Sequence, residues 1–427
     1  MKMHLSSLLV AALLPLAFSK PTPRKKSPGS FKVHVARRSS PEYMHDGPTD
    51  LQRAYAKYGL PTTEDMDGYQ PSPIADFVGH SKLAEAQSED EKGKVENNPT
   101  NHDIQFLSPV TIGGQQFIMN FDTGSSDTWV MNTRLDEATK KDHHVYDPSK
   151  SKTHKVLDGI TFDVKYGDKS HASGLVVTDV MDVGGATVKA QAIGLPSKVA
   201  ASLADDKSSD GLVGLAMTKL NSMRPTKQKT FFENLSENLD EPVFTAQLKH
   251  GMMGSYEFGA IDKTKYSGDL VKVPVDDKSG FWEISCGLYA VGQLDNIQKV
   301  QNGTGSAILD TGTTLLILDD EIVKAYYDQV KGARYESKRY AGWVYPCSSS
   351  MPSLFLAVGK DHMAIIPSTL LTFQNYGPDP DTGVDTCYGG LQSNNAGGIQ
   401  ILGDVFFKAL FVVFDKRGPS ISLAPHA

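Results

Sequence analysis

The sequence predicts an all-β protein with two similar lobes. From Ile104 onward, short apolar segments alternate with turns rich in Gly, Asp, Ser and Lys about every ten residues, which is typical of β-sheets. The tripeptide Asp-Thr-Gly occurs twice, at 122–124 and 310–312, each time after an apolar stretch. Two apolar-apolar-Gly segments, 212–214 and 401–403, end 92 and 93 residues after the respective Asp. This matched spacing indicates that the two halves repeat one topology.

The first 92 residues are expected to lie outside the two lobes. An apolar run from Leu5 to Phe18 follows Lys2, a pattern typical of a secretory signal peptide and too short to span a bilayer. Residues 20–62 carry nine Lys or Arg against three acidic residues, although the whole chain has a net charge of −7. A basic leader beside an acidic body is expected of a removable propeptide that is held by charge. The predicted segments are a signal peptide at 1–19, a propeptide at 20–92, an N-terminal lobe at 93–266 and a C-terminal lobe at 267–427.

The same features bear on location and partners. The basic stretch could instead be a nucleic-acid patch, but the signal peptide in front of it argues against that. No later segment reaches transmembrane length, and residues 420–425 carry no hydrophobic tail. The sequence therefore predicts a secreted, extracellular monomer that binds neither nucleic acid nor membrane.

Several local elements are expected from pattern alone. Residues 31–36 alternate like a strand, and a short helix should run from an N-cap at Asp50 to a stop at Gly59. Residues 61–100 are polar and aperiodic, which is typical of a linker. Within the lobes, helices are expected at 228–239 and 319–330.

Three cysteines leave one unpaired in an exported chain. Cys347 and Cys387 lie in loop contexts suited to a disulfide, and closing a loop of about 40 residues would stabilise the fold by about 4 kcal/mol. Cys286 lies in an apolar segment and is expected to be a buried thiol. A nucleophilic role for Cys286 is disfavoured because no nearby His or basic residue would lower its pKa.

The repeated Asp-Thr-Gly turns predict the chemistry. An Asp at the end of a buried strand costs several kcal/mol unless hydrogen bonds or a partner compensate. Because Asp122 and Asp310 both follow apolar strands, we expect the two carboxylates to meet. Like charges so close cannot both ionise, so one proton is shared and the site holds an acid and a base. These properties predict an aspartic endopeptidase that needs no metal or other cofactor.

With both turns and both apolar-apolar-Gly segments considered together, the sequence resembles the pepsin-like aspartic endopeptidases, in particular the secreted fungal enzymes of the aspergillopepsin and penicillopepsin type. The resemblance runs from about Gly93 to the last residue. It implies a bilobal fold with the active-site cleft between the lobes, and inhibition by pepstatin-type compounds. It also implies an acid-active enzyme, made as an inactive zymogen, that cleaves proteins and peptides with a broad preference for large hydrophobic residues.

The resemblance assigns roles to single residues. Asp122 and Asp310 match the catalytic pair, which activates a water to attack the scissile carbonyl. The threonine hydroxyl after each Asp should cross-brace the two turns, and the hydroxyl three residues after each Asp should hold its outer oxygen. Turn propensity alone is the competing explanation for these hydroxyls. The supporting residues on this basis are Thr123, Gly124, Ser125, Thr311, Gly312 and Thr313.

A second part of the resemblance is the flap, a β-hairpin that closes over substrate. Tyr166 matches its cleft-facing residue and Trp129 the indole that bonds this tyrosine, although both could be ordinary strand aromatics. Gly167 and Asp168 complete the predicted substrate-binding hairpin. The acid at Asp168 implies acceptance of Lys before the cut, but Lys169 replaces the usual Gly and could pair with Asp168 itself.

The leader and the surface carry three further candidates. Lys57, followed by Tyr58, resembles the propeptide residue that lies between the two aspartates and neutralises them at neutral pH. The protein's own propeptide is therefore an expected partner. Asn234 and Asn302 begin N-glycosylation motifs, which fit a secreted protein.

Two alternatives remain. A pepsin-like protein without catalysis, which binds or inhibits other proteins, would usually have a broken triplet or lack the flap tyrosine, and this sequence has both triplets and Tyr166. A vacuolar processing protease would share the chemistry and differ in location.

Overall fold

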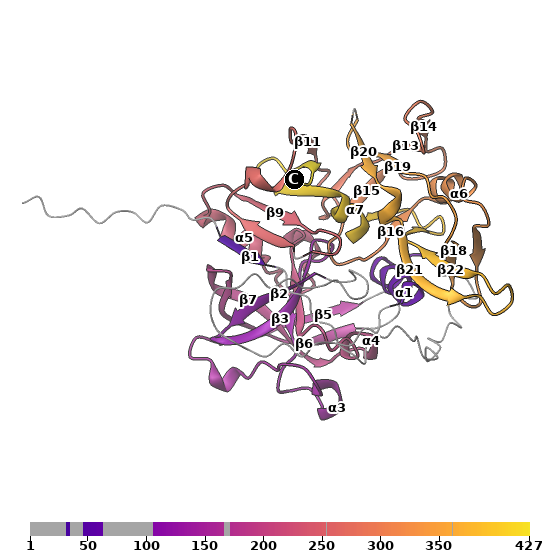
Figure 1. Ribbon diagram of the computed structural model, residues 1–427. Helices are drawn as coiled ribbons and strands as arrows, with labels where there is room; N and C mark the ends of the chain where they lie inside the picture. Colours follow the sequence, from indigo (N-terminus) through magenta and orange to yellow (C-terminus); the bar gives the residue numbers. More distant parts are fainter. Residues whose placement is uncertain (1–30, 35–45, 63–105, 166–170, 253, 361) are drawn as a thin grey trace, which may run out of the picture.

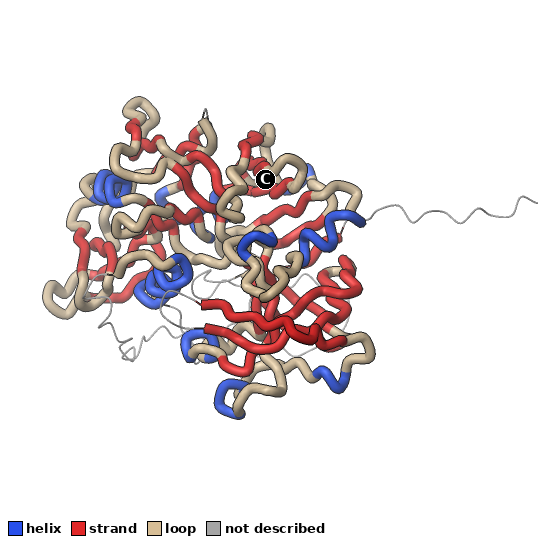
Figure 2. Tube along the Cα trace, turned by 180° about the vertical axis from the view of Figure 1, so that it is seen from behind, coloured by secondary structure: helices blue, strands red, loops and turns tan. Residues whose placement is uncertain are grey.

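The computed structural model describes residues 31–34, 46–62, 106–165, 171–252, 254–360 and 362–427. The predicted signal peptide, the junction at 92–93 and the flap residues Tyr166, Gly167 and Asp168 lie outside these ranges. Within them, strands dominate both halves and helices are short (Figure 2).

The N-terminal lobe is built on a seven-stranded sheet with the order β2-β3-β8-β4-β7-β6-β5. Its long strands β5, β6 and β7 pair antiparallel in sequence order, whereas β3 pairs parallel with the distant strand β8. The strands are β2 (Leu107–Ile112), β3 (Gln115–Asp122), β4 (Thr128–Val130), β5 (Lys155–Lys165), β6 (His171–Val183), β7 (Ala186–Lys198) and β8 (Gly211–Gly214).

The C-terminal lobe has a five-stranded sheet, β12-β15-β24-β16-β23, and two four-stranded sheets, β14-β13-β19-β20 and β17-β18-β22-β21. The first sheet consists of β12 (Glu283–Ser285), β15 (Ser306–Leu309), β16 (Leu316–Leu318), β23 (Leu391–Ser393) and β24 (Gln400–Leu402). The second consists of β13 (Leu288–Val291), β14 (Gln298–Lys299), β19 (Leu354–Ala357) and β20 (Met363–Ile366). The third consists of β17 (Arg334–Glu336), β18 (Gly342–Pro346), β21 (Thr372–Pro378) and β22 (Asp385–Gly389).

The two lobes repeat one strand arrangement, as the spacing predicts. In the first, Phe121 of β3 lies opposite Val213 of the parallel strand β8. In the second, Ile308 of β15 lies opposite Ile401 of the parallel strand β24. A short antiparallel strand, β4 or β16, then pairs with the far side of β8 or β24.

A six-stranded sheet, β1-β10-β9-β25-β26-β11, joins the lobes. Across it, the rings of Phe244 on β9 and Phe414 on β25 stack with centroids 4.4 Å apart. Strand β1 from the leader pairs with β10 at one edge and lies within the strand predicted at 31–36, of which residues 35 and 36 are outside the described ranges. The fold is therefore all-β and bilobal, which confirms the predicted class (Figure 1). The strands are β1 (Phe31–His34), β9 (Val243–Gln247), β10 (Ser255–Phe258), β11 (Val271–Pro274), β25 (Leu410–Asp415) and β26 (Ser420–Pro425).

The leader helix α1 (Gly47–Tyr58) starts earlier than the sequence predicts. An N-cap at Asp50 is wrong, because the side chain of Asp46 accepts a hydrogen bond from the Thr49 N–H and caps the helix instead. Pro48 is tolerated in the first turn of the helix, because a backbone N–H there has no partner within the helix. Gly59 ends the helix with φ 63°, as expected.

The helices of the lobes differ in length from the expected ones. In place of 228–239 the chain forms α5 (Phe231–Leu235), capped by the Thr230 side chain, and a 3₁₀ turn, η3 (Ser236–Asn238). The helix expected at 319–330 is α6 (Asp320–Tyr327). In the described part of the chain, no helix is long and apolar enough to cross a bilayer. The remaining helical elements are α3 (Glu137–Lys140), α4 (Ala201–Ala204), α7 (Asp404–Ala409), η1 (Pro148–Lys150), η2 (Thr218–Leu220), η4 (Lys263–Lys265) and η5 (Ser368–Leu370).

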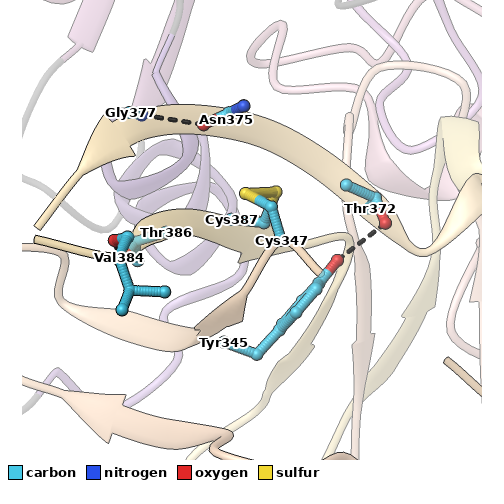
Figure 3. The surroundings of a disulfide bond; sticks show 8 residues. All are labelled: Tyr345, Cys347, Thr372, Asn375, Gly377, Val384, Thr386 and Cys387. Atoms are coloured by element: carbon cyan, nitrogen blue, oxygen red, sulfur yellow. Dashed lines mark hydrogen bonds between the residues drawn. A yellow bond between two sulfur atoms is a disulfide. The ribbon is translucent and has the colours of Figure 1, made fainter. Parts of the chain in front are cut away.

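The three cysteines divide into one disulfide and one buried thiol. Cys347, directly after β18, is bonded to Cys387 on β22, and the hydroxyl of Tyr345 donates to Thr372 of β21 beside it (Figure 3). The bond thus fastens the β17-β18-β22-β21 sheet. Cys286 is fully buried, and burial raises the pKa of its thiol to about 12, so it is not a nucleophile.

Candidate active site

Asp122 and Asp310 meet at the junction of the lobes. Asp122 is the last residue of β3 and Asp310 follows β15, and each is at most 1% exposed. A Cβ atom on Gly124 would lie 2.5 Å from Oδ1 of Asp310, and one on Gly312 would lie 2.5 Å from Oδ1 of Asp122. Each turn therefore approaches the aspartate of the other lobe so closely that only glycine fits.

The two turns are cross-braced by their threonines. The Thr123 N–H donates to Oγ1 of Thr311 at 3.2 Å, and the Thr311 N–H donates to Oγ1 of Thr123 at 3.0 Å. Each hydroxyl in turn donates across the junction, to the carbonyl oxygen of Leu309 or Phe121. These four hydrogen bonds fix the relative position of the two aspartates, because each joins one lobe to the other.

Each carboxylate is held by its own turn. The Gly124 N–H donates to Oδ1 of Asp122 at 2.8 Å, and the Ser125 hydroxyl donates to Oδ2 at 2.5 Å. The second lobe repeats this arrangement, with the Gly312 N–H and the Thr313 hydroxyl donating to Asp310. Hydrogen bonds of this kind compensate the burial of a carboxylate and fix its plane.

The two carboxyl groups are electrostatically unequal. Burial raises the pKa of Asp122 to about 6, with the ammonium of Lys57 opposing this and the charge of Asp310 adding to it. Burial acts on Asp310 as well, but Lys57 and hydrogen bonds from its neighbours outweigh it and lower the pKa of Asp310. Two carboxyl groups in this arrangement share one proton more readily than they both ionise.

Helix α1 places Lys57 directly between the two aspartates. Its Nζ lies 2.6 Å from Oδ1 of Asp122 and 2.9 Å from Oδ2 of Asp310, so the carboxylates cannot be farther apart than the sum of these distances. Burial alone would lower the pKa of Lys57, but the two aspartates outweigh it and raise the pKa. The hydroxyl of Tyr58 donates to Oδ2 of Asp310 at 2.6 Å. The leader thus occupies the polar centre of the site.

Two buried acids near the site were not predicted from the sequence. Asp127, five residues after Asp122, accepts hydrogen bonds from Asn221 and Ser222, and burial raises its pKa to about 6. The N–H of Asp404 donates to the Thr313 carbonyl, and burial raises the pKa of its carboxyl well above the usual value. Asp404 directly follows the apolar-apolar-Gly segment at 401–403 and Asp127 lies three residues after Gly124, so the repeats themselves were the available signal.

Comparisons with known proteins agree with this geometry. A family model described as eukaryotic aspartyl protease matches residues 105–426. An aspergillopepsin A-like aspartic endopeptidase of Arthroderma otae is 79% identical over 432 residues, which cover 100% of both chains. An aspartic-type endopeptidase of Arthroderma benhamiae is 77% identical over 432 residues, again 100% of both. Penicillopepsin-1 of Penicillium janthinellum is 43% identical over 336 residues, which cover 78% of this chain and 99% of that one.

The chain belongs to the eukaryotic aspartyl protease family. It is pepsin-like, as the sequence predicts, and its activity is that of an aspartic endopeptidase that hydrolyses peptide bonds in proteins and peptides.

Three further predicted positions of this aspartyl protease, Trp129, Asn234 and Asn302, lie outside the two Asp-Thr-Gly turns. Trp129 on β4 is 3% exposed, and its indole N–H has no hydrogen-bond partner within the described ranges. Asn302 is exposed in a turn, whereas the side-chain amide of Asn234 donates to Gln191 at 2.9 Å. Of the two glycosylation motifs, the one at Asn302 therefore offers the more accessible amide.

Proposed function

We propose that this aspartyl protease is made as an inactive, secreted zymogen and that acid releases its leader from the catalytic cleft. The observation that carries the proposal is the position of Lys57, whose ammonium contacts both aspartates. With that ammonium in place, no water can occupy the position between the carboxylates. The predicted signal peptide supports secretion. Of the two glycosylation motifs, the exposed one at Asn302 is proposed as the modified site.

In the released enzyme Asp122 and Asp310 act as the catalytic pair. The charged carboxylate takes a proton from the bound water as the water attacks the scissile carbonyl, and the protonated carboxyl donates to the developing oxyanion. Both carboxyl groups are held in place by hydrogen bonds that involve the hydroxyls of Thr123, Thr311, Ser125 and Thr313. Little reorganisation is therefore needed during the reaction.

The leader is proposed to end near residue 92, with lobes at 93–266 and 267–427. The start of the family match at residue 105 supports this, as does the match of penicillopepsin-1, which covers 99% of that protein but 78% of this chain. The enzyme is proposed to act as a monomer, outside the cell rather than in a vacuole. Fractionating an expressing culture into medium and cells tests the location.

Substrate preference is proposed to be broad and to favour large hydrophobic residues, beneath a flap that includes Tyr166, Gly167 and Asp168 and packs near Trp129. Whether Lys is accepted before the cut depends on whether Asp168 pairs with the substrate or with Lys169. Comparing kcat/KM for matched peptides with Lys or Phe at that position decides this, and absence of Lys turnover excludes the idea.

The zymogen proposal is tested by a pH jump. The full-length protein is purified at pH 7, shifted to acid, and followed by mass spectrometry and by hydrolysis of a peptide, with and without pepstatin. We expect no hydrolysis at pH 7, then loss of the leader and pepstatin-sensitive activity in acid. Equal activity of the intact chain at pH 7 would disprove latency, and no activity in acid would favour a non-catalytic binding protein.

A further inference from the structure

The β17-β18-β22-β21 sheet of the C-terminal lobe is apolar on both faces. On one face, the ring of Trp343 stacks on Tyr327 of α6 with centroids 4.7 Å apart. On the other face lie Val344, Phe373 and Tyr388, which belong to a separate apolar cluster. An antiparallel sheet at the edge of a protein usually presents a polar face to water. A second apolar face therefore needs a cover.

Helix α1 of the leader supplies part of that cover, beside Ile308, Ile317 and Ile401 of the five-stranded sheet, which belong to the same cluster (Figure 1). Its residues Leu51, Ala54 and Tyr55, at the i, i+3 and i+4 positions of one helical face, are at most 3% exposed in the cluster with Val344 and Tyr388. We call the surface they cover the helix groove; it is lined by Tyr340, Val344, Phe373, Tyr376 and Tyr388.

The fit between helix and groove includes polar and steric detail. The Gly47 N–H donates to Oε1 of Gln374 at 3.1 Å, and a Cβ on Gly47 would lie 2.3 Å from the ring of Tyr388. At the other end, the Tyr55 hydroxyl donates to the Ser393 carbonyl. The groove thus receives a helix along its length.

The helix groove is continuous with the catalytic site. Lys57, which contacts both aspartates, lies two residues beyond Tyr55 on the same helix. With a rise of 1.5 Å per residue, the ten residue steps from Gly47 to Lys57 span about 15 Å. A segment held in the groove would therefore leave an adjoining segment at the aspartates.

We propose that the helix groove is an exosite of the mature enzyme, which binds an amphipathic helix of a protein substrate while the adjoining segment enters the cleft. The inference rests on the proposed function, since the groove opens only when the leader leaves. Exposed apolar surfaces of this kind mark binding sites, and α1 itself defines the occupant: a helix with Leu, Ala and Tyr on one face.

The test uses acid-activated full-length protein and two peptide substrates. Both carry the same cleavable segment, preceded by a helix with the sequence of residues 46–56. In one substrate Leu51, Ala54 and Tyr55 are kept, and in the other all three are replaced by Gln, which preserves helix propensity. We expect KM to be about tenfold lower for the first substrate at equal kcat, which corresponds to about 1.4 kcal/mol of ground-state binding. Equal KM values would overturn the proposal.

Variants of the groove give a second readout. Phe373→Thr and the half-buried Tyr376→Thr should each abolish the difference between the substrates and leave hydrolysis of a short peptide unchanged. Ile365→Thr is the matched control, because Ile365 is 49% exposed on β20 of a different sheet. If the difference survives both groove variants, the helix binds elsewhere and the proposal is wrong.

A competing peptide distinguishes binding in the helix groove from binding in the catalytic cleft. A peptide of residues 46–56 lacks Lys57 and Tyr58, so it should inhibit cleavage of the apolar-helix substrate and not that of the short peptide. Inhibition of both would place it in the cleft and contradict the exosite. If acid fails to remove the leader and neither substrate is cleaved, it is the zymogen proposal that fails, which mass spectrometry identifies.

Discussion

The ammonium nitrogen of Lys57 lies 2.6 Å from Oδ1 of Asp122, although 65 residues separate them in the chain. Removing one partner of a buried ion pair leaves an uncompensated charge and costs about 3–5 kcal/mol. Lys57→Ala should therefore weaken docking of the leader, because two carboxylates would face each other without a cation. We expect leader removal at pH 6.5 to be at least about tenfold faster than in the unchanged protein, measured by gel densitometry.

Arg53→Ala is the control for Lys57→Ala. Arg53 lies on the same helix, and its guanidinium lies 3.8 Å from Oδ1 of Asp50. A Lys57→Ala protein that stays as latent as the Arg53→Ala protein would show that Lys57 does not hold the leader.

The pH dependence of release follows from the two aspartates. As pH falls through about 6, Asp122 takes up a proton, because its pKa is raised to about 6, and Lys57 loses this counter-ion. The pKa of Asp310 is lowered, so the second ion pair persists to lower pH and is lost only there. Leader release should therefore begin near pH 6 and become complete well below it, as followed by intrinsic fluorescence. Release that begins only below pH 4 would contradict this order.

The cross-brace predicts non-additive mutations. Thr123→Val removes a hydroxyl and leaves the buried Thr311 N–H without its acceptor, which should cost about 2 kcal/mol of unfolding free energy and lower kcat. Thr311→Val should act in the same way. Because the two residues share hydrogen bonds, the double variant should lose less than the sum of the single variants in urea titrations. Thr→Ser at either position keeps the hydroxyl and serves as the control.

The repeat made the meeting of Asp122 and Asp310 predictable from the sequence. Two Asp-Thr-Gly turns and two apolar-apolar-Gly segments at matched spacing predicted that the two halves repeat one topology, and the parallel pairs β3–β8 and β15–β24 are that repeat. The start of α1 was not readable in the same way, because Asp46 and Asp50 both suit an N-cap and the choice depends on Pro48 and on the docking of Gly47 against Tyr388. Helix α5 is shorter than its apolar spacing predicts, because the chain tightens into a 3₁₀ turn at Ser236.

The helix groove could not be predicted from the sequence, for a related reason. Val344, Phe373 and Tyr388 come from three strands, and their common face is set by the register of β18 and β22. Periodicity within one strand cannot show that two faces of a sheet are both buried.

The disulfide gives a stability prediction with an internal control. Cys347 and Cys387 are 40 residues apart in sequence, and a loop of that size implies about 4 kcal/mol of stabilisation. The double variant Cys347→Ser, Cys387→Ser should lose about that amount in urea titrations in the presence of pepstatin. Cys286→Ala removes only the buried thiol. A reducing agent should therefore lower the unfolding free energy of this variant and of the unchanged protein by the same amount. An unfolding free energy that does not change on reduction would show that the bridge contributes little.

Asp127 should make the folded protein less stable as pH rises. Its pKa is raised by burial to about 6 from an ordinary 3.8, so the folded state binds its proton more tightly than the unfolded state. The stabilisation is fully present below pH 4 and is lost as pH rises through 6, by about 3 kcal/mol in all. Asp127→Asn, which stays neutral, should remove this part of the slope. Urea titrations at pH 4, 5 and 6.5, with pepstatin present, measure the unfolding free energies of Asp127→Asn and the unchanged protein. The contributions of all other titrating groups cancel in the difference between the two proteins. Parallel slopes would mean that Asp127 is already charged at pH 4, held by its hydrogen bonds from Asn221 and Ser222.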